Sequence, residues 1–331
     1  MQSFVNRLWY GKSKGLTELL SLLLLPLSGL FYLISSCRRL AYRVNLSKRY
    51  RLPVPVIVVG NITVGGSGKT PTVIYLIELL RTQGFRPGVI SRGYGVSLEG
   101  TRQVLVGMPA SEVGDEPAMI VARTQVPMVI GRDRVAAAKQ LLASSDVDII
   151  ISDDGLQHYR LERDIELLIL DGERRFGNGR LLPAGPLREG LWRQHQVDFT
   201  LVNGDACQPG ELLMTLQAGE WRAVNGDNRR TFTPESDSLA MAGIGNPQRF
   251  FATLSALGIK TQKQLAFDDH QAFSLDEIQR LAGDKQVLMT EKDAVKCREF
   301  AMQNWWYLPV DAKIEHKFDQ QLIGLLQQKK R

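Results

Sequence analysis

Short apolar runs alternate with amphipathic segments between residues 53 and 204. The run 53–60 is rich in Val and bounded by Pro and Gly, which is typical of a buried parallel strand. Further strands are expected at 87–95 (with its turn), 126–131, 147–155, 165–172 and 198–204. Helical patterns fill intervals at 72–84, 114–124 and 132–144. Strands that alternate with helices predict an α/β fold, with a mostly parallel sheet and helices on both faces.

The pattern changes between residues 205 and 237, where the chain is polar, rich in turn-forming residues and expected to hold two short β segments. Strand and helix patterns then resume in what we interpret as a smaller C-terminal α/β domain. We expect a strand at 239–245, a helix at 246–258, a strand–helix pair at 285–296, a late strand at 305–314 and a basic helix at 319–330. The predicted domains are an N-terminal segment at 1–51, a larger domain at 52–222, a linker at 223–237 and the smaller domain at 238–331.

The N-terminal segment combines a long apolar run with most of the positive charge. Residues 19–37 include no charged side chain, but Pro26, Gly29 and four serines weaken them as a membrane-spanning helix. Residues 1–51 hold nine Lys or Arg and one Glu, a net charge of +8, whereas the whole chain carries +6. An apolar helix with basic flanks favours the headgroup region of an anionic membrane. The alternatives are a buried core helix, a lipoprotein signal that ends at Cys37, and a signal peptide, for which no clear cleavage site is present.

The remainder of the chain, 52–331, therefore has a net charge of −2. A nucleic-acid-binding protein usually carries basic charge over its folded body, so no nucleic-acid partner is expected. The three cysteines are odd in number and far apart, and the four histidines form no metal-binding pair. Neither a disulfide framework nor a zinc site is predicted. No obligate protein partner is predicted either.

The segment 63–70, TVGGSGKT, lies between a predicted strand and a predicted helix. It matches the end of the phosphate-binding pattern GxxxxGK[ST], although Thr63 stands where the first Gly belongs. Flexible glycines and a helix N-terminus favour phosphate binding, so we expect ATP here, with Lys69 at the β and γ phosphates and Thr70 on Mg²⁺. The residues predicted to bind the nucleotide are Thr63, Val64, Gly65, Gly66, Ser67, Gly68, Lys69 and Thr70. The fold is thus expected to be P-loop NTPase-like; a glycine-rich turn without a ligand is the alternative.

Two adjacent carboxylates, Asp153 and Asp154, end the strand pattern at 147–155, where P-loop proteins place an acid that serves Mg²⁺. Three classes of P-loop protein then compete. A GTPase would read guanine with an NKxD-like motif, but TEKD at 290–293 has the wrong order. A partition-type ATPase would carry Lys where this chain has Val64. A small-molecule kinase needs a base near the acceptor hydroxyl, and the motifs GDEP (Asp115) and DDHQAF (His270) offer candidates whose spacing does not show that they meet.

Eight motifs follow one another along the chain: VGNITVGGSGKTP, SRGYG, GDEP, DDGLQH, GNGRLLPAGPLRE, GIGNP, DDHQAF and TEKDAVK. Together they resemble the tetraacyldisaccharide 4′-kinases of lipid A synthesis, from the N-terminal segment to about residue 310. That family shares the departure at Thr63. The resemblance implies an ATP-dependent kinase at the cytoplasmic face of the inner membrane, which phosphorylates the 4′-hydroxyl of a tetraacyldisaccharide 1-phosphate. It also implies Asp115, His270 and Lys69 as catalytic residues, and a metal site of Thr70, Glu116, Asp153 and Asp154.

Three arginines lie in loops rich in Gly or Pro, at or after predicted strand ends: Arg92, Arg180 and Arg188. Ligand sites of α/β sheets form at such strand ends, so we expect one of these side chains to bind the lipid 1-phosphate or ATP. An arginine that only ties down a loop is the alternative, because guanidinium binds carboxylate and phosphate equally readily. The alternative function is a membrane-anchored P-loop ATPase switch of the partition type, which needs neither GDEP nor DDHQAF.

Overall fold

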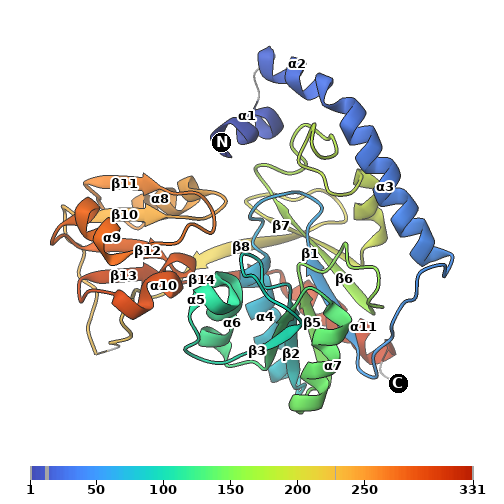
Figure 1. The fold of residues 1–331 in the computed structure, drawn as a ribbon. Coiled ribbons are helices and arrows are strands. Elements are labelled where there is room, and N and C mark those ends of the chain that lie inside the picture. Colours follow the sequence, from blue (N-terminus) through green and yellow to red (C-terminus); the bar gives the residue numbers. More distant parts are fainter. Residues whose placement is uncertain (1, 12–14, 228, 330–331) are drawn as a thin grey trace.

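The computed structural model describes residues 2–11, 15–227 and 229–329, which form two α/β domains (Figure 1). Within these residues, nine strands form the larger sheet in the order β14-β8-β7-β6-β1-β5-β2-β4-β3. Only the edge strands β3 and β14 run antiparallel to their neighbours, so the predicted mostly parallel sheet is confirmed. The strands are β1 (Val56–Gly60), β2 (Pro87–Ser91), β3 (Thr101–Val104), β4 (Met128–Gly131), β5 (Ile149–Asp153), β6 (Ile165–Asp171), β7 (Phe199–Asn203), β8 (Leu212–Ala218) and β14 (Val310–Ile314).

Helices cover both faces of this sheet, as the alternating pattern predicts. Successive side chains of a strand point to opposite faces, and β1 places Ile57 and Val59 in one core and Val56 and Val58 in the other. Each such fully buried side chain contributes about 1.5–3 kcal/mol to folding. The first core lies under α4 (Lys69–Thr82), α6 (Asp115–Thr124) and α11 (His316–Lys329), and the second under α7 (Arg134–Ser144). A short helix, α5 (Ala110–Val113), precedes α6.

The smaller domain has a five-stranded sheet in the order β11-β10-β12-β13-β9, parallel except for β9. Its strands are β9 (Arg222–Ala223), β10 (Leu239–Ala242), β11 (Lys263–Ala266), β12 (Val287–Thr290) and β13 (Trp305–Leu308). Its helices are α8 (Pro247–Ala256), α9 (Leu275–Ala282) and α10 (Glu291–Cys297). Side-chain hydroxyls cap α9 and α10: Ser274 accepts the N–H of Glu277, and Thr290 accepts that of Asp293.

The sheets divide the chain differently from the predicted domains. The smaller sheet begins with β9 at residue 222 and ends with β13, whereas β14 and α11 return to the larger domain. The expected late strand at 305–314 is therefore two strands in two sheets, separated at Pro309, whose lack of an N–H interrupts strand pairing. The smaller domain is inserted between β8 and β14, so the chain crosses between the domains twice.

The N-terminal segment forms three helices, α1 (Gln2–Tyr10), α2 (Leu16–Leu23) and α3 (Leu25–Arg43), and α3 runs along the outside of the larger domain (Figure 1). Two of the four serines of the apolar run face the protein: Ser21 donates a hydrogen bond to the carbonyl of Ala184, and Ser28 donates to that of Leu181. The large apolar side chains point to solvent, among them Leu19, Leu23, Leu27, Leu30, Leu33, Ile34 and Leu40. This exposure rules out the buried core helix that the sequence left open.

Among the described residues, no single helix has the length and apolar character needed to cross a membrane. The segments Thr17–Leu23 and Leu25–Arg43 reach that length only as a pair, and they are bent by 48° at the break between them.

Candidate active site

The predicted phosphate loop connects β1 to α4, in the strand–loop–helix context that the motif requires. The loop ends where α4 begins at Lys69, so its N–H groups lie at the positive end of a helix. Gly68 has a φ of 100°, and a Cβ at this position would lie 2.8 Å from Nδ2 of Asn203. Both the backbone conformation and the packing therefore require glycine at this position.

Side chains from distant segments hold the loop. Nδ2 of Asn203, at the end of β7, donates a hydrogen bond to the carbonyl of Ser67 at 3.1 Å. The Tyr10 hydroxyl, in α1, donates to the carbonyl of Val64 at 2.9 Å, and the Val64 N–H donates to the carbonyl of Pro186 at 2.9 Å. A polar residue at a strand end was the only sequence signal for Asn203, and Tyr10 gave none. The shape of the loop thus depends on the N-terminal segment as well as on the sheet.

Asp153 and Asp154 lie beside the loop, where β5 pairs with β1. Burial, together with the charges of Glu116 and Asp154, raises the pKa of Asp153 to about 7. Burial also acts on Asp154, but Lys69 (Nζ to Oδ1, 3.6 Å) and Arg188 (Nη1 to Oδ2, 3.1 Å) outweigh it and lower the pKa of Asp154 to about 2. The neighbouring cations therefore favour the charged form of Asp154, whereas burial and the nearby carboxylates disfavour the charged form of Asp153.

The residues beside the loop fit a magnesium site. Oδ1 of Asp153 is buried without a hydrogen-bond partner, while its Oδ2 accepts from the hydroxyl of Ser91 at 3.1 Å. Mg²⁺ is commonly held by one or two carboxylates and by substrate phosphates, so this oxygen and the hydroxyl of the buried Thr70 suit it. Glu116, also predicted at the metal, forms an ion pair with Lys292 at 3.1 Å, and its charge acts on Asp153. No group of three His, Cys, Asp or Glu side chains in the described part of the chain is arranged to hold a metal by itself.

Asp115 and His270 meet across the two domains. Asp115 is the first residue of α6, His270 precedes α9, and Nδ1 of His270 lies 2.9 Å from Oδ2 and 3.1 Å from Oδ1 of Asp115. Burial would raise the pKa of Asp115, but the hydrogen bond from His270 and the charge of Lys292 lower it. Burial would lower the pKa of His270, but the hydrogen bond with Asp115 raises it. The pair is an ionised carboxylate beside a basic imidazole, which is suited to accepting a proton from an alcohol.

Two further features of the site are not predicted by the sequence. Asp154 and His270 have φ values of 48° and 64°, a left-handed region that residues other than glycine rarely adopt and that concentrates at functional sites. Tyr94 packs its ring against that of His270, with centroids 4.8 Å apart. Tyr94 belongs to the motif SRGYG, which marks the resemblance but carried no predicted role.

The three arginines predicted at the substrate site lie in different places. Arg188 binds Asp154 beside the phosphate loop. Arg180 donates a hydrogen bond from Nη1 to the hydroxyl of Ser21 at 2.7 Å, which places it against α2. Arg92 is exposed after β2, and it makes no hydrogen bond or ion pair with any other residue that the structure describes. Only Arg188 is thus brought to the phosphate loop.

A loop of the smaller domain touches the phosphate loop at Gly245, within the motif GIGNP. Arg174, after β6, donates a hydrogen bond from Nη1 to the carbonyl of Gly245 at 3.0 Å, and its guanidinium lies over the ring of Tyr10. A Cβ on Gly245 would lie 2.8 Å from the backbone nitrogen of Gly66. The two backbones approach so closely that only glycine fits between them.

We expect Gly245→Ala to lower kcat by roughly 10- to 100-fold, because the added methyl group holds the smaller domain away from the phosphate loop. Steady-state kinetics with ATP as the varied substrate would measure the loss. Gly324→Ala is the control, since a Cβ on this glycine of α11 meets no atom within 4 Å. Unchanged kcat and KM in Gly245→Ala would show that the contact has no part in the reaction.

Comparisons with known proteins match nearly the whole chain. The family model of LpxK, the tetraacyldisaccharide-1-P 4′-kinase, matches residues 20–327. A tetraacyldisaccharide 4′-kinase of Shewanella loihica is 67% identical over 331 residues, covering 99% of this chain and 98% of the relative. One of Shewanella sediminis is 59% identical, covering 98% of this chain and 99% of the relative. A crystal structure of LpxK from Aquifex aeolicus in complex with ATP is 30% identical, with a TM-score of 0.78, over 93% of this chain and 99% of that one.

Proposed function

The chain belongs to the tetraacyldisaccharide-1-P 4′-kinase family, and we propose that it transfers the γ-phosphoryl group of ATP to the 4′-hydroxyl of a tetraacyldisaccharide 1-phosphate at a membrane surface. The product is the 1,4′-bisphosphate. Membership of the family makes the chain a kinase of lipid A biosynthesis. The ATP bound to the Aquifex aeolicus protein supports ATP as the phosphoryl donor.

The observation that carries the proposal is the contact between Asp115 and His270 beside the phosphate loop. Glu116, which follows Asp115, is close enough to Asp153 to raise the pKa of that carboxyl. The base dyad and the loop therefore share one site. A membrane-anchored ATPase switch needs the loop but no base assembled from a second domain, so the contact favours the kinase.

Each residue of the site has its own task in the proposed transfer. Asp115, oriented by His270, accepts the proton of the 4′-hydroxyl as the oxygen attacks the γ-phosphorus. The new P–O bond forms as the bond to the leaving ADP oxygen breaks. Lys69 and the N–H groups of the loop stabilise the negative charge of the transferred group. Because the dyad includes one residue from each domain, the domains must be together during transfer, which also excludes water and limits ATP hydrolysis.

Other polar residues of the site are proposed to bind Mg²⁺ and the phosphate groups of ATP and of the lipid. Mg²⁺, held by Asp153 and Thr70, would neutralise charge on the β and γ phosphates. Arg188, which Asp154 holds beside the loop, is placed to bind a phosphate of ATP. Arg180 lies against α2, on the side where the N-terminal helices would hold a lipid, so we assign the 1-phosphate of the acceptor to it.

The N-terminal helices supply the proposed membrane contact. A four-chain lipid stays in its membrane, so the enzyme must come to the surface. The exposed apolar side chains of α2 and α3 and the net charge of +8 in residues 1–51 suit an anionic bilayer surface. With ATP as the donor, this surface is the cytoplasmic face of the inner membrane.

Radiolabelled ATP tests the proposed function. The purified protein would be mixed with Mg²⁺, ATP labelled in the γ-phosphate and detergent-dispersed tetraacyldisaccharide 1-phosphate, and the products separated on thin-layer plates. Transfer of label to the lipid supports the kinase. Label that appears only as inorganic phosphate, with or without lipid, would contradict it and favour the ATPase switch.

We expect Leu33→Glu to weaken binding to anionic phospholipid vesicles by roughly tenfold or more. A Leu side chain that enters the apolar part of the bilayer contributes about 1.5–3 kcal/mol to the free energy of binding, and Glu loses this contribution. Sedimentation of vesicles with bound protein would measure the partition coefficient. Leu257→Glu is the matched control: Leu33 of α3 is 59% exposed, and Leu257, which follows α8, is 50% exposed. Equal losses in the two variants would argue against a specific role of α3.

A further inference from the structure

Lys292 joins the two domains at the base dyad. It is the second residue of α10, and its side chain is 13% exposed. Its Nζ lies 2.9 Å from Oδ1 of Asp269, 3.1 Å from Oε1 of Glu116 and 3.7 Å from Oδ2 of Asp115. The first of these carboxylates belongs to the smaller domain, and the other two begin α6 of the larger domain. One ammonium group thus binds carboxylates on both sides of the domain boundary.

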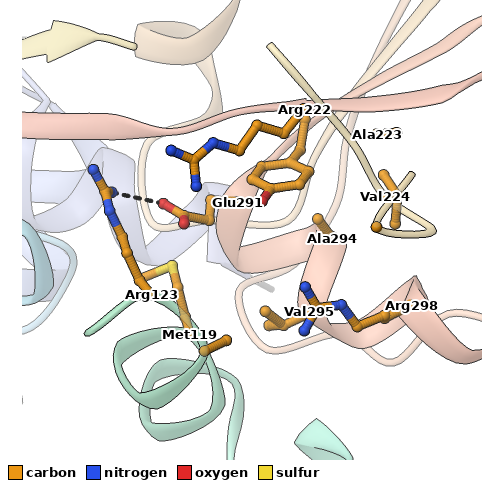
Figure 2. Close-up of a pocket in the computed structure, with 12 residues that line it drawn as sticks. Met119, Arg123, Arg222, Ala223, Val224, Glu291, Ala294, Val295 and Arg298 are labelled. Carbon is orange, nitrogen blue, oxygen red and sulfur yellow. Dashed lines mark hydrogen bonds and ion pairs between the residues drawn. The ribbon is translucent and has the colours of Figure 1, made fainter. Parts of the chain in front are cut away.

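The backbone of α10 is fixed on both sides of Lys292. Glu291, which precedes it, accepts a hydrogen bond at 2.9 Å from Nη1 of Arg123 in the last turn of α6, beside a cavity of about 210 Å³ (Figure 2). Asp293, which follows it, is fully buried and accepts a hydrogen bond from the hydroxyl of Thr290 at 2.6 Å. Glu291 therefore ties the first turn of α10 to the last turn of α6, and the cap between Thr290 and Asp293 fixes that turn, which gives the ammonium a defined position.

The same helix holds the loop of His270 on both sides of the imidazole. Lys292 binds Asp269, the residue before His270, and Lys296 donates a hydrogen bond at 3.1 Å to the carbonyl of Gln271, the residue after it. Residues four apart lie on one face of a helix, so one face of α10 presents both lysines. The left-handed backbone at His270 is costly for a residue with a side chain and persists only where its surroundings hold it.

We propose that Lys292 is a positioning residue that assembles the base dyad, an inference that rests on the proposed kinase function. By binding Asp269 and Asp115 at once, Lys292 draws the loop of His270 onto Asp115. Without the ammonium, the carboxylates of Asp115, Glu116 and Asp269 would face one another and repel, and the imidazole would lose its alignment. The competing explanation is a buried ion network that only stabilises the fold.

Kinetics of Lys292→Met separate the two explanations. Misplacement of a catalytic group by about 1 Å can cost up to 10²-fold, so we expect kcat for lipid phosphorylation to fall roughly 10- to 100-fold, with the KM for ATP little changed. Lys292→Arg, which keeps the charge, should recover most of the loss. Arg193→Met is the matched control, because Arg193 is a buried cation that binds Glu166 within the larger domain. It should lower the melting temperature without lowering kcat of the folded enzyme.

The same substitution in a His270→Ala enzyme shows whether Lys292 acts through His270. In His270→Ala, the additional change Lys292→Met should lower kcat by no more than about twofold, since the group that it positions is already absent. A full additional loss, or wild-type kcat in Lys292→Met alone, overturns the inference. Failure of the proposed function is distinguishable, because the unaltered enzyme would then transfer no label to lipid. If Lys292→Met does not fold, Asp269→Asn, which removes the carboxylate that Lys292 binds beside His270, gives the same comparison in the wild-type and His270→Ala enzymes.

Discussion

Asp115→Ala is expected to lower kcat by roughly 10²–10⁴, the usual contribution of a general base, while the KM for ATP stays nearly unchanged. The carboxylate contacts His270 and Lys292 but no residue of the phosphate loop, so nucleotide binding should persist. The fold should persist as well, because Lys292 keeps its ion pairs with Glu116 and Asp269. Initial rates of lipid phosphorylation at saturating ATP, with the melting temperature measured in parallel, would show both effects.

A comparison with His270→Ala shows which residue of the dyad accepts the proton of the 4′-hydroxyl. The side chain of His270 is 25% exposed and that of Asp115 only 6%, so the imidazole is the more accessible half of the dyad. If Asp115 accepts the proton, its removal costs more than the loss of His270; the reverse order would transfer the role of base to the imidazole. Asp276→Ala, at an exposed carboxylate of α9, is the control and should leave kcat unchanged. Wild-type kcat in Asp115→Ala would remove this residue from the mechanism.

Lys69→Met is expected to lower kcat by roughly 10²–10³, because the variant loses the cation that stabilises charge on the transferred phosphoryl group. Unlike loss of the dyad, this change should also abolish any ATP hydrolysis that occurs without lipid. The loop itself should keep its shape, since Asn203 and Pro186 hold it through backbone groups. Rates of lipid phosphorylation and of phosphate release from the same preparation would separate the two activities.

Lys263→Met is the control for this prediction, because Lys263 is an exposed lysine of β11 in the smaller domain. Asp154 keeps its contact with Arg188 when Lys69 is replaced, so a change of charge alone does not leave that carboxylate unpaired. A Lys69→Met enzyme with wild-type kcat at saturating ATP would show that the loop lysine does not act on the transferred group.

The sequence predicted those elements whose structure depends on residues that are close together in the chain. The strand–loop–helix around Gly68 follows from alternating apolar runs and a glycine that a left-handed backbone requires. Asp153 could be placed beside the loop because the ends of neighbouring parallel strands meet at one edge of a sheet. The exposed apolar face of α3 was expected from its uncharged run and basic flanks. In these cases the determining residues are close together in the sequence or belong to one repeating unit.

Contacts across the domains lay beyond such patterns. The pairing of Asp115 with His270 joins residues 155 positions apart, and only the resemblance to a family suggested it. Lys292 lies in TEKDAVK, a motif that helped to mark the resemblance but for which the sequence suggested no role beyond a guanine-reading pattern of the wrong order. Arg188 was expected at a phosphate and binds the carboxylate of Asp154, since a guanidinium suits both and spacing does not choose between them. The apolar pattern at 305–314 likewise did not show that Pro309 separates strands of two sheets. The alternation of apolar and polar residues indicates which side chains are buried, but it does not identify the neighbouring strand.

The return of the chain to the larger sheet has a consequence for biosynthesis. The edge of β8 is paired by β14, and the first core is completed by Phe318, Leu322 and Leu326 of α11. These elements are made after the smaller domain, so a nascent chain carries an open sheet edge and exposed core residues until the ribosome has passed residue 329. Unpaired edges and uncovered cores are where aggregation and proteolysis begin. Translation that stops within the smaller domain would therefore leave fragments for proteases to clear, rather than a shortened nucleotide-binding protein.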